Sequence, residues 1–344
     1  GLVQLPIDAD DDGSALRDGA PRALAMAELA AAEALRDAAF STPSPRLGLC
    51  VGTTLGEKVP WLATLRGQAG SDGTGFGPAA PARALASRHG MSQVRVVSAA
   101  CASSNAALAV GVDWVRRGRC DAVLCGGVDS LQEFVIAGFV ALRAQSPSPC
   151  RPFDSDRAGM NLGEGAAFLL LEAEDHALAR GQRVRAFVDG AGQACDASHM
   201  TGPDREGRGA TRAMRAALVD AGLEAAGIDF VSAHGTATLF NDLMEAHALG
   251  SLFGERVATV PVNSIKGSIG HALGAAGALE AVMAVRVLEE QLIPPTAGHA
   301  RLDEKIRLDV VAGTPRPASV RRVLSTSSGF GGLNAALVLS GGPR

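Results

Sequence analysis

Two short apolar segments of similar sequence each end at a residue capable of chemistry. The first, "RVVSAAC" (95–101), ends at Cys101, and the second, "DFVSAHG" (229–235), ends its strand pattern at His234. A helical pattern follows each segment, so both predict a buried strand that leads into a helix. Because repeated patterns indicate repeated architecture, we predict a duplicated fold with one chemical residue at the same place in each half. A chance similarity of two strand compositions is the alternative.

Strands and helices alternate along most of the chain, which is typical of α/β layers around a largely parallel sheet. We divide the chain into an N-terminal half, residues 1–175, which carries the cysteine, and a C-terminal half, residues 176–344, which carries the histidines. The segments "FLLLE" and "ALVLS" close the two halves in the same way. An Ala-rich helix is predicted at 21–40, and a loop is predicted at the Gly/Pro/Ala-rich stretch 69–82.

The composition excludes several classes of protein. Of the 344 residues, 47% are hydrophobic and 20% are charged, which is typical of a folded globular chain and not of a disordered one. The net charge of −4 provides no basic field for nucleic acid. No apolar segment approaches the ~20 residues of a membrane helix and no signal peptide is evident, so we expect a cytoplasmic protein without a membrane partner. The six cysteines have neither disulfide nor zinc spacing, so no metal site is predicted.

Candidate catalytic residues occur in three glycine-rich or alanine-rich settings. Cys101 begins a predicted helix, where the helix dipole and unpaired N–H groups favour a thiolate, although a small core cysteine is the alternative. "SAHGTATLF" places His234 at a strand end, and "NSIKGSIGHALGAAG" holds Lys266 and His271 among glycines. "STSSGFGGLN" sets Phe330 in a glycine turn whose N–H groups can approach a ligand closely. A lone histidine is usually structural, but this combination indicates a catalytic site.

The same segments resemble those of β-ketoacyl-[acyl-carrier-protein] synthases of the elongating type, which belong to the thiolase-fold condensing enzymes. The matching stretches are "VSAACASSNAAL", "RPFDSDRAGMNLGEGAAFLLLE", "SAHGTATLFNDLMEAHAL", "NSIKGSIGHALGAAGALEAV" and "STSSGFGGLNAALVL", and they extend from about residue 20 to the end of the chain. The resemblance implies a duplicated thiolase-like fold with five layers, α-β-α-β-α, and mixed sheets. Relatives that use Cys-His-Asn or paired cysteines would not carry both "HGTAT" and the spacing Lys-x-x-x-x-His.

The resemblance also implies a role for each candidate residue. Cys101 would accept the acyl group as nucleophile, and His234 and His271 would flank its thiol. Lys266 and Glu245 would form the supporting ion pair, although spacing alone is equally compatible with Glu245 as a solvated helix residue and leaves Lys266 a surface charge as its alternative. The lysine would keep both imidazoles neutral, since a nearby cation disfavours imidazolium.

Further residues would shape the substrate site. Phe330 would be the gating aromatic, and its backbone N–H would form the oxyanion hole together with that of Cys101. Thr236 and Thr238 would lie beside the phosphopantetheine arm. Met160 stands where an aromatic pocket residue is usual, so we expect an acyl tunnel of different shape. Leu239 replaces the proline that usually follows the second threonine, which predicts an altered turn.

The implied reaction is decarboxylative Claisen condensation of an acyl group on Cys101 with malonyl-[acyl-carrier protein], in bacterial fatty acid, polyketide or polyene biosynthesis. It requires no metal or redox cofactor, because the substrates are carried on the phosphopantetheine of an acyl carrier protein. The alternatives are a non-catalytic partner subunit of a heterodimeric ketosynthase, an acyl-loading variant without condensation and, less favoured, a hydrolase.

The expected partners are the acidic carrier protein and a second subunit, either a second copy of the chain or a related ketosynthase-like protein. The family's usual opening strand is not recognisable, and its loss would leave a sheet edge and a pocket that a partner completes. Two groups of arginines are candidates for carrier docking: Arg116, Arg117 and Arg119, and Arg205, Arg208, Arg212 and Arg215.

Overall fold

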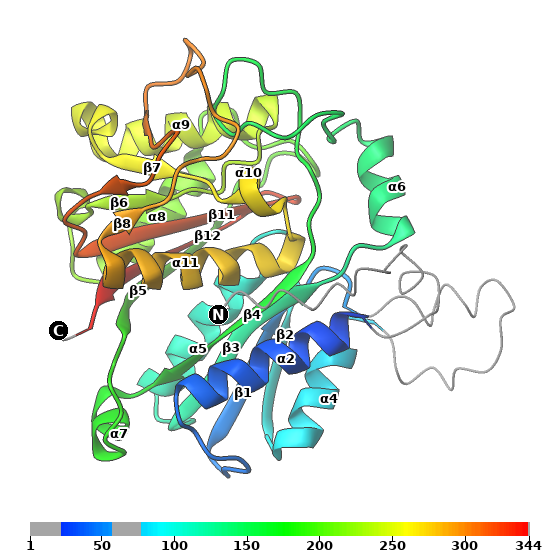
Figure 1. Cartoon of the computed structure of the whole chain (residues 1–344), viewed down its shortest axis with the longest axis vertical. Helices are drawn as coiled ribbons and strands as arrows, with labels where there is room; N and C mark the ends of the chain where they lie inside the picture. Colours follow the sequence, from blue (N-terminus) through cyan, green and yellow to red (C-terminus); the bar gives the residue numbers. More distant parts are fainter. Residues whose placement is uncertain (1–21, 57–76, 343–344) are drawn as a thin grey trace, which may run out of the picture.

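The computed structural model describes residues 22–56 and 77–342, which form two sheets with helices between and outside them (Figure 1). The described strands of the first sheet lie in the order β2 (Gln93–Val97), β1 (Leu47–Gly52), β3 (Ala122–Asp129) and β4 (Gly165–Glu172). β1 runs parallel to β2 and β3, whereas β4 runs antiparallel to β3. The sheet is therefore mixed, as predicted.

The second sheet has the order β5 (Ala186–Cys195), β12 (Leu333–Gly341), β11 (Arg322–Gly329), β6 (Phe230–Ser232), β7 (Pro261–Asn263) and β9 (Asp309–Val310). β11, β6, β7 and β9 run parallel to one another, whereas β12 is antiparallel to both β5 and β11. β8 (Leu292–Ile293) and β10 (Arg316–Pro317) form a separate antiparallel pair.

Helices occupy three layers. α5 (Ser103–Arg116) and α11 (Ala276–Glu290) lie between the two sheets and pack against both. α2 (Arg22–Asp37) and α4 (Ala80–His89) cover the outer face of the first sheet, and α8 (Arg208–Asp220), with α9 (Leu239–Phe253) packed on it, covers the second. The predicted α-β-α-β-α arrangement is confirmed. The remaining short helices are α6 (Glu133–Ala141), α7 (Glu174–Ala179), α10 (Lys266–Ile269), η1 (Ala225–Gly227), η2 (Gly254–Ala258) and η3 (Leu273–Ala275).

The two central helices are held by the core between the sheets. Leu108 and Trp114 of α5 and Leu288 of α11 pack with Val123 of the first sheet and Phe230 of the second. Small residues allow the close approach that such a layer needs, and a Cβ added at Gly111 would lie 2.0 Å from the Cys125 sulfur. α5 is therefore fixed against both sheets, and with it Cys101, which lies two residues before the helix.

The duplication is visible in the strand order, but the two chemical residues do not occupy the same place in each half. With β4 and β12 as the antiparallel strands, the row β2-β1-β3-β4 corresponds to β7-β6-β11-β12. Cys101 follows β2, whereas His234 follows β6, the counterpart of β1. The prediction of equivalent positions is therefore wrong, because similar strand composition does not encode strand position. Within the described residues, β4 is an edge strand, whereas its counterpart β12 is flanked by β5.

Two other predictions meet a different structure. Residues 57–76 of the chain lie outside the described residues, but α4 begins at Ala80, so the end of the loop predicted at 69–82 is wrong. Pro81 stands in the first turn of α4, where its missing N–H costs nothing, and alanines favour the helix that follows. The boundary predicted between residues 175 and 176 falls inside α7, and the division into halves stays a prediction.

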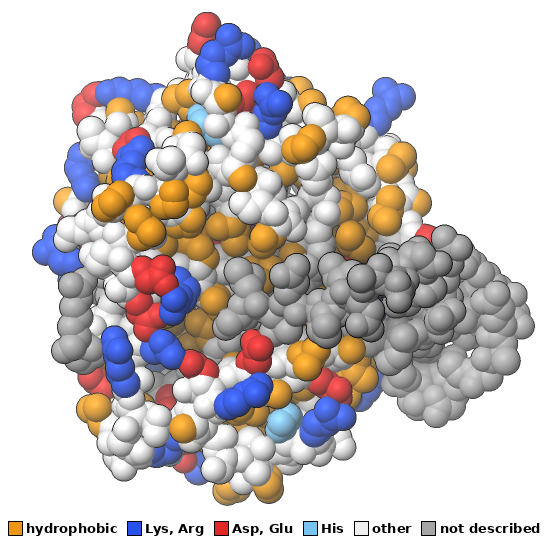
Figure 2. All heavy atoms as spheres, viewed as in Figure 1, with side chains coloured by type: hydrophobic (Ala, Val, Ile, Leu, Met, Phe, Trp, Pro, Cys, Tyr) orange, Lys and Arg blue, Asp and Glu red, His pale blue; other side chains and the backbone are white. Residues whose placement is uncertain are grey.

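α6 presents apolar side chains to the surface. Phe134, Ile136, Val140 and Leu142 in and after this helix are all exposed, whereas Val135 is buried. Figure 2 shows hydrophobic side chains gathered where Figure 1 draws α6. The helix is thus attached to the body by one side only. Among the described residues, no helix combines the length and apolar character needed to cross a bilayer.

Candidate active site

Cys101 lies in a tight turn between the first sheet and the central helix layer. β2 ends at Val97, Ala100 adopts a left-handed conformation (φ 49°), and α5 begins two residues after the cysteine. A Cβ added at Gly329 would lie 3.0 Å from the Cys101 nitrogen, so the end of β11 packs directly against the cysteine backbone. Two segments more than 220 residues apart in sequence thus meet at the sulfur-bearing residue.

The thiol is protonated near neutral pH, contrary to the expectation drawn from its position before a helix. Burial raises the pKa of Cys101 to about 12, and the nearby Lys266 ammonium lowers it only in part. The Asp129 and Glu280 carboxylates raise it further. Nucleophilic attack therefore requires that the proton move to another group, because the resting state is a thiol.

Both predicted histidines lie in the same buried site. Their ring centroids are 5.2 Å apart and the rings meet edge to face at 83°. Burial, followed by the Lys266 charge, places the pKa of both His234 and His271 well below the usual value, so both are neutral. Within the described residues, the Nδ1 of His234 and both ring nitrogens of His271 have no hydrogen-bond partner although they are buried. Unpartnered buried nitrogens are costly to leave alone and are available to a substrate.

Each histidine is held through its backbone. His234 lies two residues after the end of β6, and its N–H donates to the Glu245 carboxylate at 2.7 Å. His271 lies between α10 and η3, and its N–H donates to the Asn161 carbonyl at 2.7 Å. Its carbonyl in turn accepts the N–H of Gly163 at 3.0 Å. The backbone of residues 161–163 therefore pairs with His271 as a neighbouring strand would.

Lys266 is ion-paired with Glu280, and the predicted pair with Glu245 is wrong. Lys266 Nζ donates to Glu280 Oε1, and both side chains are at most 2% exposed. Burial raises the pKa of Glu280 to about 7 even though the lysine lowers it. Glu245 instead accepts the N–H groups of His234 and Gly235 and the Thr326 hydroxyl, so it supports the histidine turn. The sequence signal for Glu280 was a single acidic residue within the apolar run "GAAGALEAVMAV".

The two threonines lie in one turn, as predicted. The Thr236 and Thr238 hydroxyls are 2.8 Å apart, and Ala237 between them has a φ of 64°. Asp242, at the start of α9, accepts the N–H groups of Thr236 and Ala237, each at 3.1 Å. Burial raises the pKa of Asp242 to about 6.

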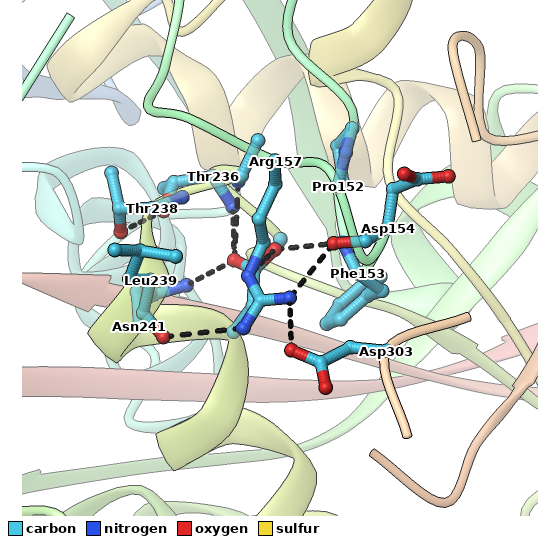
Figure 3. Close-up of polar contacts among 12 residues, drawn as sticks. Pro152, Phe153, Asp154, Arg157, Thr236, Thr238, Leu239, Asn241 and Asp303 are labelled. Atoms are coloured by element: carbon cyan, nitrogen blue, oxygen red, sulfur yellow. Dashed lines mark hydrogen bonds and ion pairs between the residues drawn. The ribbon is translucent and has the colours of Figure 1, made fainter. Parts of the chain in front are cut away.

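Arg157, a buried arginine that the sequence motifs did not single out, supports the threonine turn through Asp242. Arg157 Nη1 lies 2.6 Å from Asp303 and donates to the Asp154 carbonyl at 2.8 Å, while Nε lies 3.8 Å from Asp242. Figure 3 shows the guanidinium reaching between the Asp303 carboxylate and the main chain at Leu239, whose carbonyl it contacts at 3.4 Å. Leu239, at the position expected to carry proline, is thus fixed through its backbone.

Phe330 and Met160 have different surroundings. Phe330 stacks on Phe139 of α6 with centroids 5.8 Å apart, and the following Gly331 and Gly332 have φ values of 83° and 74° that favour glycine. Met160 is buried, and its N–H donates to the Ala144 carbonyl. Cys101 belongs to an apolar cluster with two buried aliphatic residues, Val135 and Leu273, and three partly buried apolar residues, Leu55, Phe139 and Leu162. One side of the thiol is thus apolar.

The arrangement joins a protonated thiol, two neutral imidazoles and a buried ammonium–carboxylate pair beside an apolar wall. The remaining histidines are occupied elsewhere, through hydrogen bonds with Thr42, Glu172, the 201–202 main chain, Arg205 and Pro152. Such a site suits acyl transfer to sulfur, followed by chemistry that passes through an oxyanion and needs neutral hydrogen-bond donors.

Comparison with known proteins agrees with this chemistry. Two family models match, the Beta-ketoacyl synthase N-terminal domain at residues 18–177 and its C-terminal domain at residues 185–300. The chain therefore belongs to the β-ketoacyl synthase family, the thiolase-fold condensing enzymes. It is an acyltransferase of the β-ketoacyl synthase class.

Two relatives illustrate the similarity in sequence. The chain is 39% identical over 327 residues to Nodulation protein E from Rhizobium meliloti, which covers 91% of the chain and 80% of that protein. It is 37% identical over 348 residues to Putative polyketide beta-ketoacyl synthase 1 from Streptomyces halstedii, covering 94% and 82%.

Two solved structures illustrate the similarity in fold. The ishigamide ketosynthase/chain length factor superposes with a TM-score of 0.88 at 36% identity, over 99% of this chain and 84% of that one. A type II PKS ketosynthase in complex with its acyl-carrier protein, bound to the hexaketide, superposes with a TM-score of 0.87 at 28% identity, over 94% and 85%. The predicted thiolase-like fold is thereby confirmed.

Proposed function

We propose that Cys101 carries the growing acyl group and that the protein condenses it with malonyl-[acyl-carrier protein] to give a β-ketoacyl-[acyl-carrier protein]. One observation carries the proposal: a buried thiol and two adjacent neutral imidazoles all lie under the influence of the Lys266 charge, and three ring nitrogens of the imidazoles are buried without a partner. A partner subunit without catalysis would not need to keep this set of unsatisfied groups, each of which costs stability.

The first step is acyl transfer. The Cys101 sulfur attacks the thioester carbonyl of the incoming acyl carrier, its proton passes to a neutral imidazole, and the carrier thiol leaves after taking up that proton. The backbone N–H groups of Cys101 and Phe330 face the tetrahedral oxyanion, and one such donor is typically worth ~3 kcal/mol. The close packing of Gly329 on the Cys101 backbone supports this assignment.

The second step is decarboxylative condensation. The malonyl group loses CO2, and the resulting enolate oxygen accepts hydrogen bonds from His234 and His271. A neutral imidazole has one N–H group that can donate such a bond. The enolate carbon then forms a bond to the acyl carbonyl carbon, the carbon–sulfur bond to Cys101 breaks, and the released thiolate takes up a proton from solvent. No electron is gained or lost overall, so the proposal includes no redox cofactor or metal. Thr236 and Thr238 would orient the pantetheine arm, and Met160 would shape the acyl tunnel.

The proposed partners are an acyl carrier protein and a second ketosynthase-like subunit, whether identical or related. Solved relatives support both, since one is a ketosynthase in complex with its acyl-carrier protein and another is a ketosynthase/chain length factor. The cytoplasm is the location we propose, because carrier-bound substrates are made there. Most arginines of the two candidate docking groups donate hydrogen bonds within the chain. The acceptors are the carboxylates of Asp220, Asp113 and Asp204 and the carbonyls of Cys195 and Ser251.

The test is intact-protein mass after incubation with acyl carrier proteins that hold a range of acyl groups. Wild type should gain one acyl group, Cys101→Ala should gain none, and the matched control Cys195→Ala, which changes the exposed cysteine, should load like wild type. Malonyl-carrier protein added to the loaded sample should then release a β-ketoacyl product. Absence of loading for every acyl group would favour the partner-subunit alternative, and loading without condensation would favour the acyl-loading one.

A further inference from the structure

Asp129 is a buried carboxylate at the edge of the site to which neither the motifs nor the proposed reaction assigns a role. It is the last residue of β3 and is 2% exposed. Its Oδ1 accepts the Thr53 hydroxyl at 2.7 Å and the Leu55 N–H at 3.3 Å. Its Oδ2 accepts the Thr54 hydroxyl at 2.8 Å, the Thr54 N–H at 2.9 Å and the Gly274 N–H at 2.7 Å. Five donors from two distant segments thus converge on one side chain.

One of these donors belongs to the turn that follows His271. Leu273 in this turn has a φ of 50°, a conformation that is unfavourable for a leucine and persists only when its surroundings hold it. The adjacent Gly274 has no room for a side chain, since an added Cβ would lie 2.6 Å from Asp129 Oδ2 and 2.8 Å from the Thr53 Cα. Asp129 therefore holds a strained turn at the point where the strands β1 and β3 end.

The strained turn connects the two reactive parts of the site. Its N-terminal neighbour is His271, and the Leu273 side chain belongs to the same apolar cluster as Cys101. A shift of the turn would displace the imidazole and the apolar wall at the sulfur together. Asp129 also acts on the sulfur through its charge, because Asp129, Glu280 and Lys266 are the charged groups that influence the thiol.

We propose that Asp129 is a positioning residue, which acts through the turn at 272–275 to set the His271 imidazole and the apolar wall against the Cys101 thiol. The inference rests on the proposed condensation. An ionised carboxylate accepts at both oxygens, whereas an asparagine of the same shape offers one accepting oxygen and one NH2 group that can only donate. Asp129→Asn must therefore lose the donors at one oxygen while it preserves the volume of the side chain.

The experiment compares Asp129→Asn with Asp121→Asn, which removes a carboxylate at the opposite end of the same strand, where it pairs with Arg46 at the surface. Malonyl decarboxylation and condensation should fall about 10- to 100-fold in Asp129→Asn, as expected for a displaced catalytic group, with a smaller change in acyl loading. Asp121→Asn should retain wild-type rates. Thr54→Val, which removes only one of the five donors, should give a smaller loss of the same kind and provides the test if Asp129→Asn does not fold.

A second readout does not depend on turnover. The pH profile of Cys101 alkylation by iodoacetamide should shift to lower pH in Asp129→Asn, because the variant lacks one of the two carboxylates that disfavour the thiolate. The inference is overturned if condensation and the alkylation profile both match those of wild type, or if loading and condensation fall equally with an unshifted profile. Failure of the proposed function is a different result, since wild type itself would then not load or not condense.

Discussion

The Lys266–Glu280 pair gives the sharpest test of the site, because the motifs alone suggested Glu245 in its place. Replacing Glu280 by glutamine keeps the volume of the side chain but leaves the Lys266 ammonium buried without its carboxylate. Breaking a buried ion pair in this way costs about 3–5 kcal/mol. Glu245→Gln instead weakens hydrogen bonds to two backbone N–H groups and one hydroxyl, which costs about 1–3 kcal/mol.

The assay is urea unfolding at pH 8, above the pKa of about 7 that burial gives Glu280, so that its carboxylate is ionised. Each glutamine variant is made alone and together with Lys266→Met. Partners in contact deviate from additivity by about 0.5–3 kcal/mol, so Lys266 and Glu280 should show this coupling and the double variant should be more stable than the sum of the single changes predicts. The cycle of Lys266 with Glu245 should lie closer to additivity.

Refutation would take one of two forms. Equal destabilisation by Glu280→Gln and Glu245→Gln would contradict the assignment of the buried charge to one of them. Stronger coupling of Lys266 to Glu245 than to Glu280 would restore the pairing predicted from the motifs. A change in the urea dependence (m value) of any variant would mean that its unfolded or native state had also changed, and only cycles with a constant m value count toward the comparison.

Three further predictions follow from the same geometry. Because the folded pKa of His271 lies well below its unfolded value of about 6.5, acidification below pH 6.5 protonates the unfolded chain first and lowers the free energy of unfolding. His271→Asn should remove up to about 1.4 kcal/mol per pH unit of that slope in unfolding curves, and an unchanged slope would contradict a neutral buried ring. Iodoacetamide should label exposed Cys195 before Cys101 at pH 8, and peptide mapping that shows Cys101 labelling saturated near pH 7 would contradict its raised pKa. Gly329→Ala should push the Phe330 turn away from the Cys101 nitrogen, since the new Cβ would lie 2.9 Å from the Ala99 carbonyl, and a folded variant that loads acyl groups at the wild-type rate would contradict the proposed oxyanion hole.

The sequence predicted the α/β layers and most of the residues that meet in the site, because both depend on local patterns, whereas the resemblance to the condensing enzymes implied the five-layer order. Apolar strands followed by helices predict α/β layers, and Cys101, His234 and His271 stand at the ends of strands or in short turns whose glycines and alanines are visible in the chain. The structure brings His234 and His271 together with Lys266 in one buried site, as the motifs implied. Their roles in catalysis stay predictions until the loading experiment is done.

The sequence alone did not identify which side chains contact each other across the fold. Glu245 lies closer to His234 in sequence than Glu280 does, and only the packing of α11 between the sheets brings Glu280 to Lys266. Asp129 is the last residue of an ordinary buried strand, and its five donors lie 74 to 76 and 145 residues away in the sequence. Strand order likewise depends on strand pairing. The similar segments around Cys101 and His234 therefore indicated duplication but predicted the wrong positions for the two residues.

The protonation of the site follows from which of two opposing effects is larger at Cys101. A helix N-terminus stabilises a nearby negative charge by about 0.3–1 kcal/mol, or up to ~2 kcal/mol when partly buried. Burial acts in the other direction, and a thiol pKa of about 12 corresponds to a rise of roughly 4 kcal/mol in the cost of the thiolate. The helix therefore cannot maintain a standing thiolate, and in the proposed reaction the Cys101 proton passes to one of the two imidazoles during attack. Since the Lys266 charge and burial both keep those imidazoles neutral at rest, they are able to accept it, and the same neutral rings can afterwards donate to an enolate.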